Sequence, residues 1–248
     1  MPRCGNETSC LFGPVHSRRL GQSLGIDLIK FKTCTFNCVF CECGPTTALQ
    51  TQRGIFVPAS AVMQELESFF AGFNSALDVL TFSGGGEPTL AANLGEVIKE
   101  IKKKYSQYKL CLLTNSTLLP DPQVRAEILP VDITIASLNA VSEDIFTKIN
   151  RPANDITSAK VQNGLLEFKQ NYPGKLLLEI FIVPGLNDTA EELVNLRDFA
   201  RVLKPNGIQL NSLDRPSAES WVKPATPEKM LEIKKLFAEF NTDYYLAK

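Results

Sequence analysis

The chain has 248 residues, of which 44% are hydrophobic and 21% charged, so it is long enough for one large α/β domain or two small ones. Its 26 Lys and Arg residues nearly cancel its 27 Asp and Glu residues, which weakens the case for a nucleic-acid partner without excluding a local basic patch. No apolar run approaches the ~20 residues of a membrane-spanning helix, and the N-terminus shows no signal-peptide pattern. We therefore expect a cytoplasmic protein without a membrane partner.

Short apolar runs rich in β-formers alternate with amphipathic, charge-bearing runs along the whole chain. Strands are predicted over 24–31, 77–82, 109–114, 131–138, 176–183 and 208–212. Helices are predicted over 58–70, around 94–101, over 142–149 and 158–170, around 193–200, and over 227–240. This alternation predicts a parallel sheet covered by helices. Whether the sheet is open, doubly wound or curved into a barrel does not follow from periodicity, but in each case a site is expected at the carboxyl ends of the strands.

The number of strand–helix units leaves little chain for a second domain. We expect residues 1–248 to form a single domain, with an N-terminal extension over 1–23 and the strand–helix units over 24–248.

Three cysteines follow the first predicted strand with the spacing Cys-x3-Cys-x2-Cys, namely Cys34, Cys38 and Cys41. Thiolates suit soft metals and iron–sulfur clusters. Three of them can bind three irons of a cubane and leave the fourth iron open, as a catalytic zinc keeps one open position. The alternative is a zinc site with Cys43 as the fourth ligand, although the paired Cys-x2-Cys knuckles usual for zinc are absent.

Four further cysteines and one histidine carry weaker signals. The total of seven cysteines is odd, and in a cytosolic-looking chain this favours metal ligands or reactive thiols over disulfides. Cys111 lies in a predicted strand and is expected in the core. Cys4, Cys10 and Cys43 could bind an auxiliary cluster, although no regular spacing supports it. His16 is left without a predicted role.

The cysteine spacing, with the aromatic Phe40 directly before the third cysteine, resembles the signature of the radical S-adenosylmethionine (SAM) superfamily. The resemblance implies a TIM-like partial (β/α)6 barrel of parallel strands over 24–248. It also implies a [4Fe–4S] cluster on the three cysteines, with SAM chelating the fourth iron and Phe40 beside the cofactor. Reductive cleavage of SAM would then yield a 5′-deoxyadenosyl radical that abstracts a substrate hydrogen atom.

Segments after three other predicted strands fit the same resemblance. The run 83–89 resembles the family's Gly-Gly-Glu segment, whose backbone contacts the SAM amino group, and three consecutive glycines leave its register open by one residue. The resemblance further implies contacts with the SAM ribose or carboxylate from polar residues after the third and fourth strands, although such residues are also common in turns and helix caps. The SAM-binding residues expected are Gly84, Gly85, Gly86, Glu87, Asn115, Ser116, Ser137 and Asn139.

Polar residues on the last two predicted strands are candidates for substrate contact. Glu179 interrupts an otherwise apolar strand, where a carboxylate is costly unless it is paired. We therefore expect Glu179 to be a site residue, to form a salt bridge or to lie at a solvent-facing edge. Gln209, Asn211 and Arg215 lie along and after the next strand. Solvated loop residues would have the same pattern.

Residues 17–27 and 82–89 resemble a group of Fe–S oxidoreductases near the wyosine-type tRNA enzymes. This narrower resemblance names no substrate, which could be a small molecule, a nucleoside or a protein, and it implies an external electron donor such as flavodoxin or ferredoxin. Two other functions remain open. One is an activase that installs a glycyl radical on a partner protein, and the other is a non-catalytic iron–sulfur or zinc electron carrier, which needs no SAM pocket.

Overall fold

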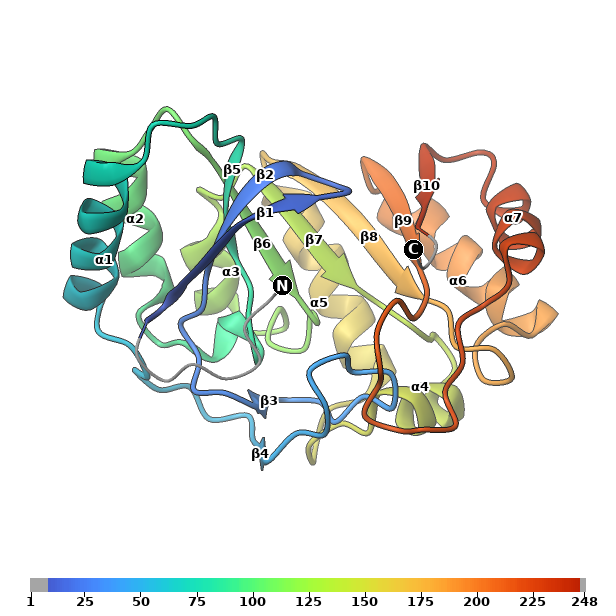
Figure 1. Cartoon of the computed structure of the whole chain (residues 1–248). Helices are drawn as coiled ribbons and strands as arrows, with labels where there is room; N and C mark the ends of the chain where they lie inside the picture. The colour runs from blue at the N-terminus through green and yellow to red at the C-terminus, as the bar shows by residue number, and fades with distance from the viewer. Residues whose placement is uncertain (1–8, 246–248) are drawn as a thin grey trace.

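The computed structural model describes residues 9–245. In this part of the chain, an eight-stranded sheet has the strand order β1-β2-β5-β6-β7-β8-β9-β10, and a small second sheet pairs β3 with β4. Helices flank the large sheet along its length (Figure 1). None of the described helices is both long and apolar enough to cross a membrane.

The strands are β1 Leu11–Ser17, β2 Gly21–Ile26, β3 Thr33–Cys34, β4 Ala48–Leu49, β5 Val79–Phe82, β6 Lys109–Thr114, β7 Ile133–Ser137, β8 Lys175–Phe181, β9 Gly207–Asn211 and β10 Thr242–Tyr244. The helices are α1 Ala59–Gly72, α2 Leu94–Lys104, α3 Pro122–Ile128, α4 Glu143–Asn150, α5 Ser158–Asn171, α6 Ala190–Leu203 and α7 Pro227–Leu236, with a short 3₁₀ helix, η1, over Pro88–Leu90.

The six predicted strands correspond to β2 and β5 to β9, and each pairs in parallel with the next in that order. At least one α-helix lies between each of these strands and the next of the six, and α7 follows β9. This arrangement confirms the predicted α/β class and the TIM-like partial (β/α)6 barrel.

The first strand differs from its prediction at both ends. It ends at Ile26 and not at residue 31, because Asp27 Oδ1 accepts a hydrogen bond from the Ile29 N–H at 3.0 Å and turns the chain. Before it, β1 pairs antiparallel with β2, from Leu11 opposite Ile26 to Ser17 opposite Gly21. Part of the segment predicted as an extension therefore belongs to the sheet.

Side chains alternate between the two faces of the sheet, and each face has its own apolar packing. The outer face packs against the helices in the main core. On the inner face, Val79, Cys111, Ile135 and Leu177 form a small separate cluster, which we call the inner apolar layer, and Leu20 packs against it. The predicted core position of Cys111 is confirmed, since its side chain is fully buried.

The β1–β2 hairpin reaches across the inner face of the sheet (Figure 1). Its tip carries Arg18 and Arg19. Arg18 Nη2 lies 3.3 Å from Asp214 Oδ2 in the loop after β9, and Arg19 forms an ion pair with Glu179 of β8. The hairpin tip is thereby linked to strands at the far side of the sheet.

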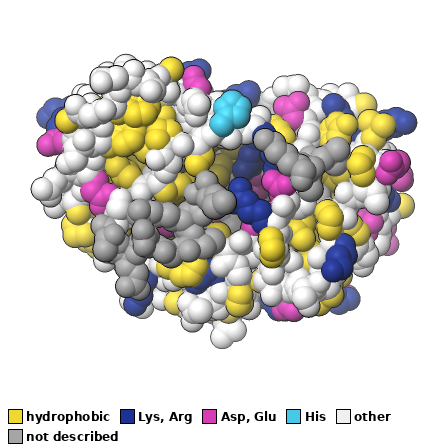
Figure 2. Space-filling model, viewed as in Figure 1, with side chains coloured by type: hydrophobic (Ala, Val, Ile, Leu, Met, Phe, Trp, Pro, Cys, Tyr) yellow, Lys and Arg dark blue, Asp and Glu magenta, His cyan; other side chains and the backbone are white. Residues whose placement is uncertain are grey.

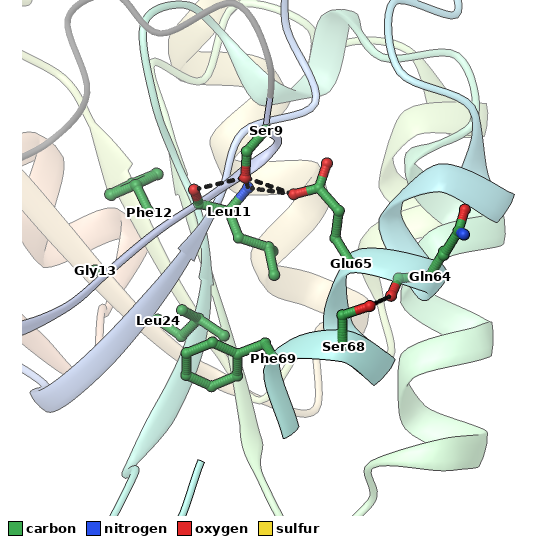
Figure 3. Close-up of a pocket in the computed structure, with 9 residues that line it drawn as sticks. All are labelled: Ser9, Leu11, Phe12, Gly13, Leu24, Gln64, Glu65, Ser68 and Phe69. Carbon is green, nitrogen blue, oxygen red and sulfur yellow. Dashed lines mark hydrogen bonds between the residues drawn. The ribbon is translucent and has the colours of Figure 1, made fainter. Parts of the chain in front are cut away.

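A hollow of about 550 Å³ lies between β1 and α1, and its lining residues are drawn in Figure 3. Glu65 of α1 accepts hydrogen bonds there from the Ser9 hydroxyl at 2.5 Å and from the Cys10 N–H at 3.0 Å. These bonds satisfy the backbone at the start of β1 and fasten this edge strand to the helix. The hollow contains none of the predicted site residues.

Candidate functional site

The predicted site residues lie at or after the carboxyl ends of the parallel strands, as expected from the sequence. The cysteine loop follows β2 and lies at the end of the sheet toward which the arrows of β7 and β8 point (Figure 1). Residues 84–87, which we call the glycine segment, follow β5. Asn115 follows β6, and Ser137, Phe181 and Asn211 end β7, β8 and β9.

The cysteine loop is held by backbone hydrogen bonds to two neighbours. Cys34 pairs in β3 with Leu49 of β4. Farther along, the Asn37 and Val39 N–H groups donate at 3.0 Å to the carbonyls of Asn150 and Ile149, at the end of α4. The positions of the three cysteines are therefore set by the fold around them.

The three thiols are half-buried, and each lies beside a polar group. Lys32 Nζ donates to Cys41 Sγ at 3.2 Å, Asn115 Nδ2 lies 3.5 Å from Cys34 Sγ, and Cys38 Sγ lies 3.7 Å from Asn150 Oδ1. The N–H donors beside Cys41 and Cys34 suit thiolates bound to iron, whose properties depend on such bonds, whereas the Cys38 thiol donates to an amide oxygen. Neither Lys32 nor Asn150 could be predicted as a site residue from the sequence, because a lysine before the motif and an asparagine more than 100 residues away give no spacing signal.

In the described part of the chain, no three His, Cys, Asp or Glu side chains converge closely enough to hold a single metal ion. A cubane does not require such convergence, because its three cysteines bind three different irons. Three cysteine thiolates are the kind of donor set that iron–sulfur clusters take.

The environment divides the three thiols into two kinds. Burial raises the pKa of Cys34 to about 12 and that of Cys38 well above its usual value. The pKa of Cys41 is instead lowered to about 5, chiefly by a hydrogen bond from the Cys43 side chain and also by the nearby Lys32 ammonium. In the metal-free protein, Cys41 is therefore the thiolate of the three at neutral pH.

This difference predicts the order in which the metal-free cysteines react with an alkylating agent. Because the thiolate is the nucleophile, the rate at Cys41 should rise as pH increases through about 5 and then level off. The rates at Cys34 and Cys38 should still be rising at alkaline pH. Mass spectrometry after brief iodoacetamide pulses measures each site, and Cys43→Ala should move the Cys41 inflection to higher pH. Equal rates at the three sites at pH 7 would contradict the assignment.

The glycine segment packs against the chain that leads into the cysteine loop. A Cβ atom on Gly84 would lie 2.0 Å from the Asp27 side chain, and one on Gly86 would lie 2.0 Å from the Thr33 carbonyl oxygen. The Gly85 N–H donates to Asp27 Oδ2 at 2.8 Å. The absence of side chains on these glycines therefore allows the segment and the cysteine loop to approach each other closely.

Glu87 is fully enclosed by protein and holds the glycine segment to β6. Its Oε1 accepts hydrogen bonds from the Thr89 N–H at 3.1 Å and the Thr114 hydroxyl at 2.7 Å, and its Oε2 accepts one from the Asn115 N–H at 2.7 Å. Burial raises the pKa of this carboxyl. Any contact of this segment with a ligand must therefore come from its backbone, since the Glu87 side chain is occupied.

The other residues expected to bind SAM fall into two groups. Asn115 borders the cysteine loop through Cys34 and also donates to the Thr35 hydroxyl at 2.8 Å, and Ser137 Oγ lies 3.1 Å from Glu179 Oε1. Ser116 is buried and donates to the Ser137 carbonyl at 2.9 Å. Asn139 is also buried, and its side chain bonds to Asn150 and to the Phe181 N–H. The structure thus places the first pair at the site and uses the second pair for internal hydrogen bonds.

Phe40 connects the cysteine loop to the end of β8. Its ring stacks on Phe181 with a centroid distance of 4.2 Å and an interplanar angle of 12°. The aromatic residue before Cys41 thereby lies beside the strand that also carries Glu179.

Polar side chains line the inner face of the sheet near the inner apolar layer. We call this group the polar layer, and its members are Arg19, Ser137, Glu179, Gln209 and Asn211. Glu179 pairs with Arg19 and accepts hydrogen bonds from the Asn211 amide at 2.6 Å and from Ser137. Arg19 Nη1 also donates to Gln209 Oε1 at 3.2 Å. Figure 2 shows Lys or Arg and Asp or Glu side chains together in a hollow near the centre of the face shown. The salt-bridge interpretation of Glu179 is correct, and its partner, Arg19, comes from a hairpin that the sequence analysis did not predict.

The remaining candidates lie outside the polar layer or outside the described residues. Arg215 is exposed on the loop after β9, where its N–H donates to Glu42 Oε1 at 3.1 Å. Cys10 is buried, and burial raises the pKa of its thiol to about 12. His16 is exposed on β1, and Cys4 lies outside the described residues.

Two known proteins are similar to this chain over most of its length. The chain is 36% identical over 231 residues to the GTPase Obg of Brachyspira hyodysenteriae, a match that covers 93% of this chain but only 34% of that protein. It is 39% identical over 207 residues to the UPF0026 protein slr1464 of Synechocystis, covering 83% of this chain and 76% of the relative.

The fold also matches solved structures. A structure of TYW1 with a lysine-pyruvate adduct bound has a TM-score of 0.64 and 16% sequence identity, and the match covers 89% of this chain and 75% of that one. TYW1 is a wyosine-type enzyme, so the predicted relation in fold to that group is confirmed.

The family model of the radical SAM superfamily matches residues 28–200, a range that holds the cysteine loop, the glycine segment and Glu179. The chain therefore belongs to the radical SAM superfamily.

Proposed function

We propose that this protein is a radical SAM enzyme that cleaves SAM reductively and removes a hydrogen atom from a substrate bound over the polar layer. The observation that carries the proposal is the placement of Cys34, Cys38 and Cys41 beside the glycine segment and Asn115, at the carboxyl ends of the strands. Superfamily members generally use a [4Fe–4S] cluster and SAM.

At this end of the sheet, different residues would bind the cluster and SAM. Cys34, Cys38 and Cys41 would hold three irons, and the backbone of 84–87 would face the SAM amino group. When bound, the cluster and SAM would supply the chemistry of one-electron reductive cleavage. Glu87 keeps the glycine segment in place through Thr114 and Asn115, and the surrounding side chains must exclude water.

The polar layer is the proposed substrate site. It is connected to the cysteine loop through the β8 strand, because Glu179 and Phe181 lie on the same strand and Phe181 stacks on Phe40. Its carboxylate, guanidinium and amide groups suit a polar small molecule or nucleoside better than an apolar one. An external flavodoxin or ferredoxin would supply the electron.

The test is release of 5′-deoxyadenosine. The protein would be reconstituted anaerobically with iron and sulfide and then given SAM and a strong reductant. We expect slow release without substrate. Stimulation by small polar compounds would support the proposal in full, whereas stimulation only by a glycyl-radical enzyme would identify an activase.

A further inference from the structure

Lys32 is a buried lysine two residues before the cysteine motif. The residue is 3% exposed and has a positive φ of 60°. Its N–H donates to the Gly85 carbonyl at 3.0 Å, and its own carbonyl accepts from the Ala48 N–H at 3.0 Å. The backbone of Lys32 therefore joins the glycine segment to β4, and these bonds do not depend on its side chain.

Within residues 9–245, the Lys32 ammonium has no carboxylate partner. It donates to Cys41 Sγ at 3.2 Å, and no Asp or Glu among the described residues lies within ion-pair distance of it. A buried cation is costly unless an opposite charge compensates it. The negative charge that compensates Lys32 is thus the sulfur of a residue that we assign as an iron ligand.

A cation at this position has a defined electrostatic effect on a cluster. Reduction adds a negative charge to the cluster, and a nearby buried cation stabilises that charge more than it stabilises the oxidised form. Hydrogen bonds to ligand sulfurs and net charge are among the factors that set Fe–S reduction potentials. A lysine that donates to Cys41 Sγ therefore raises the potential.

We propose that Lys32 is a positioning residue for the cluster, which holds the Cys41 sulfur through its ammonium and makes the cluster easier to reduce. The inference rests on the cluster assignment of the proposed function. It extends that assignment by naming a residue that sets how readily the electron for SAM cleavage is accepted.

The experiment is a redox titration of the reconstituted protein without SAM, followed by electron paramagnetic resonance. Lys32→Met should lower the midpoint potential, and Lys32→Arg, which retains the charge, should remain near the wild type. Lys30→Met is the matched control, because Lys30 lies two residues away but is exposed, where water and salt screen its charge. Lys30→Met should leave the potential unchanged. An unchanged potential in a fully loaded Lys32→Met protein would overturn the inference.

Iron content and the thermal unfolding midpoint of the metal-free protein separate the other outcomes. If Lys32→Met unfolds like the wild type but retains less iron, while Lys32→Arg retains all of it, the inference is supported through the loss of Cys41 positioning. If Lys32→Met fails to fold, Lys32→Gln takes its place in the titration. Because SAM is absent, a wild type that titrates normally but never cleaves SAM would defeat the proposed function alone. A wild type that binds no cluster would defeat both.

Discussion

Cys38→Ala should bind no stable [4Fe–4S] cluster and should release no 5′-deoxyadenosine from SAM. Cys38 lies between the other two ligands in sequence, and its neighbour Val39 is fixed to the end of α4 by a backbone hydrogen bond. Loss of one of three ligands leaves a second iron without a protein ligand. The measurements are iron and sulfide content, visible absorbance and SAM turnover after anaerobic reconstitution.

The matched control for this variant is Cys111→Ala. Cys111 is fully buried in the inner apolar layer, and its loss should lower stability slightly while iron content stays at the wild-type level. A Cys38→Ala protein that retained full iron content and activity would show that the three-cysteine assignment is incorrect.

Glu87→Ala should cause the largest loss of stability among the site variants, of about 2–4 kcal/mol in the free energy of unfolding. The carboxylate is fully buried, and its removal leaves the donors on Thr89, Thr114 and Asn115 without an acceptor. An unsatisfied buried donor costs the desolvation energy of that group. Denaturant unfolding of the metal-free protein measures the change.

Glu100→Ala provides the comparison, because Glu100 lies exposed on α2 and surface substitutions usually change stability by less than about 0.5 kcal/mol. If Glu87→Ala were as stable as Glu100→Ala, Glu87 would not anchor the glycine segment, and its side chain would be free for another role.

The parallel strands could be predicted because they are short and apolar and are separated by amphipathic runs. The prediction for 109–114 matches β6 residue for residue. The missed strands are those with weak local patterns. β1 contains Gly13 and Pro14, which interrupt its pairing between Phe12 and Val15, and β10 has only three residues, too few for a detectable period.

The cysteines of the candidate site were predictable because their ligand spacing lies within one short loop. The partners that define their surroundings were not, because they come from distant parts of the chain. Arg19 and Glu179 are 160 residues apart in sequence, and the hairpin that brings them together was itself not predicted. The role of Glu87 also depends on β6, since its acceptor atoms are taken by Thr114 and Asn115.

The most direct test of the central claim is the amount of 5′-deoxyadenosine and methionine released from SAM by the reduced, reconstituted wild type, measured beside Cys38→Ala under the same conditions. We expect equal amounts of the two products from the wild type and neither above background from the variant. A wild type with a complete [4Fe–4S] cluster that released neither product, with or without a panel of small polar compounds, would contradict this expectation and would favour an electron carrier.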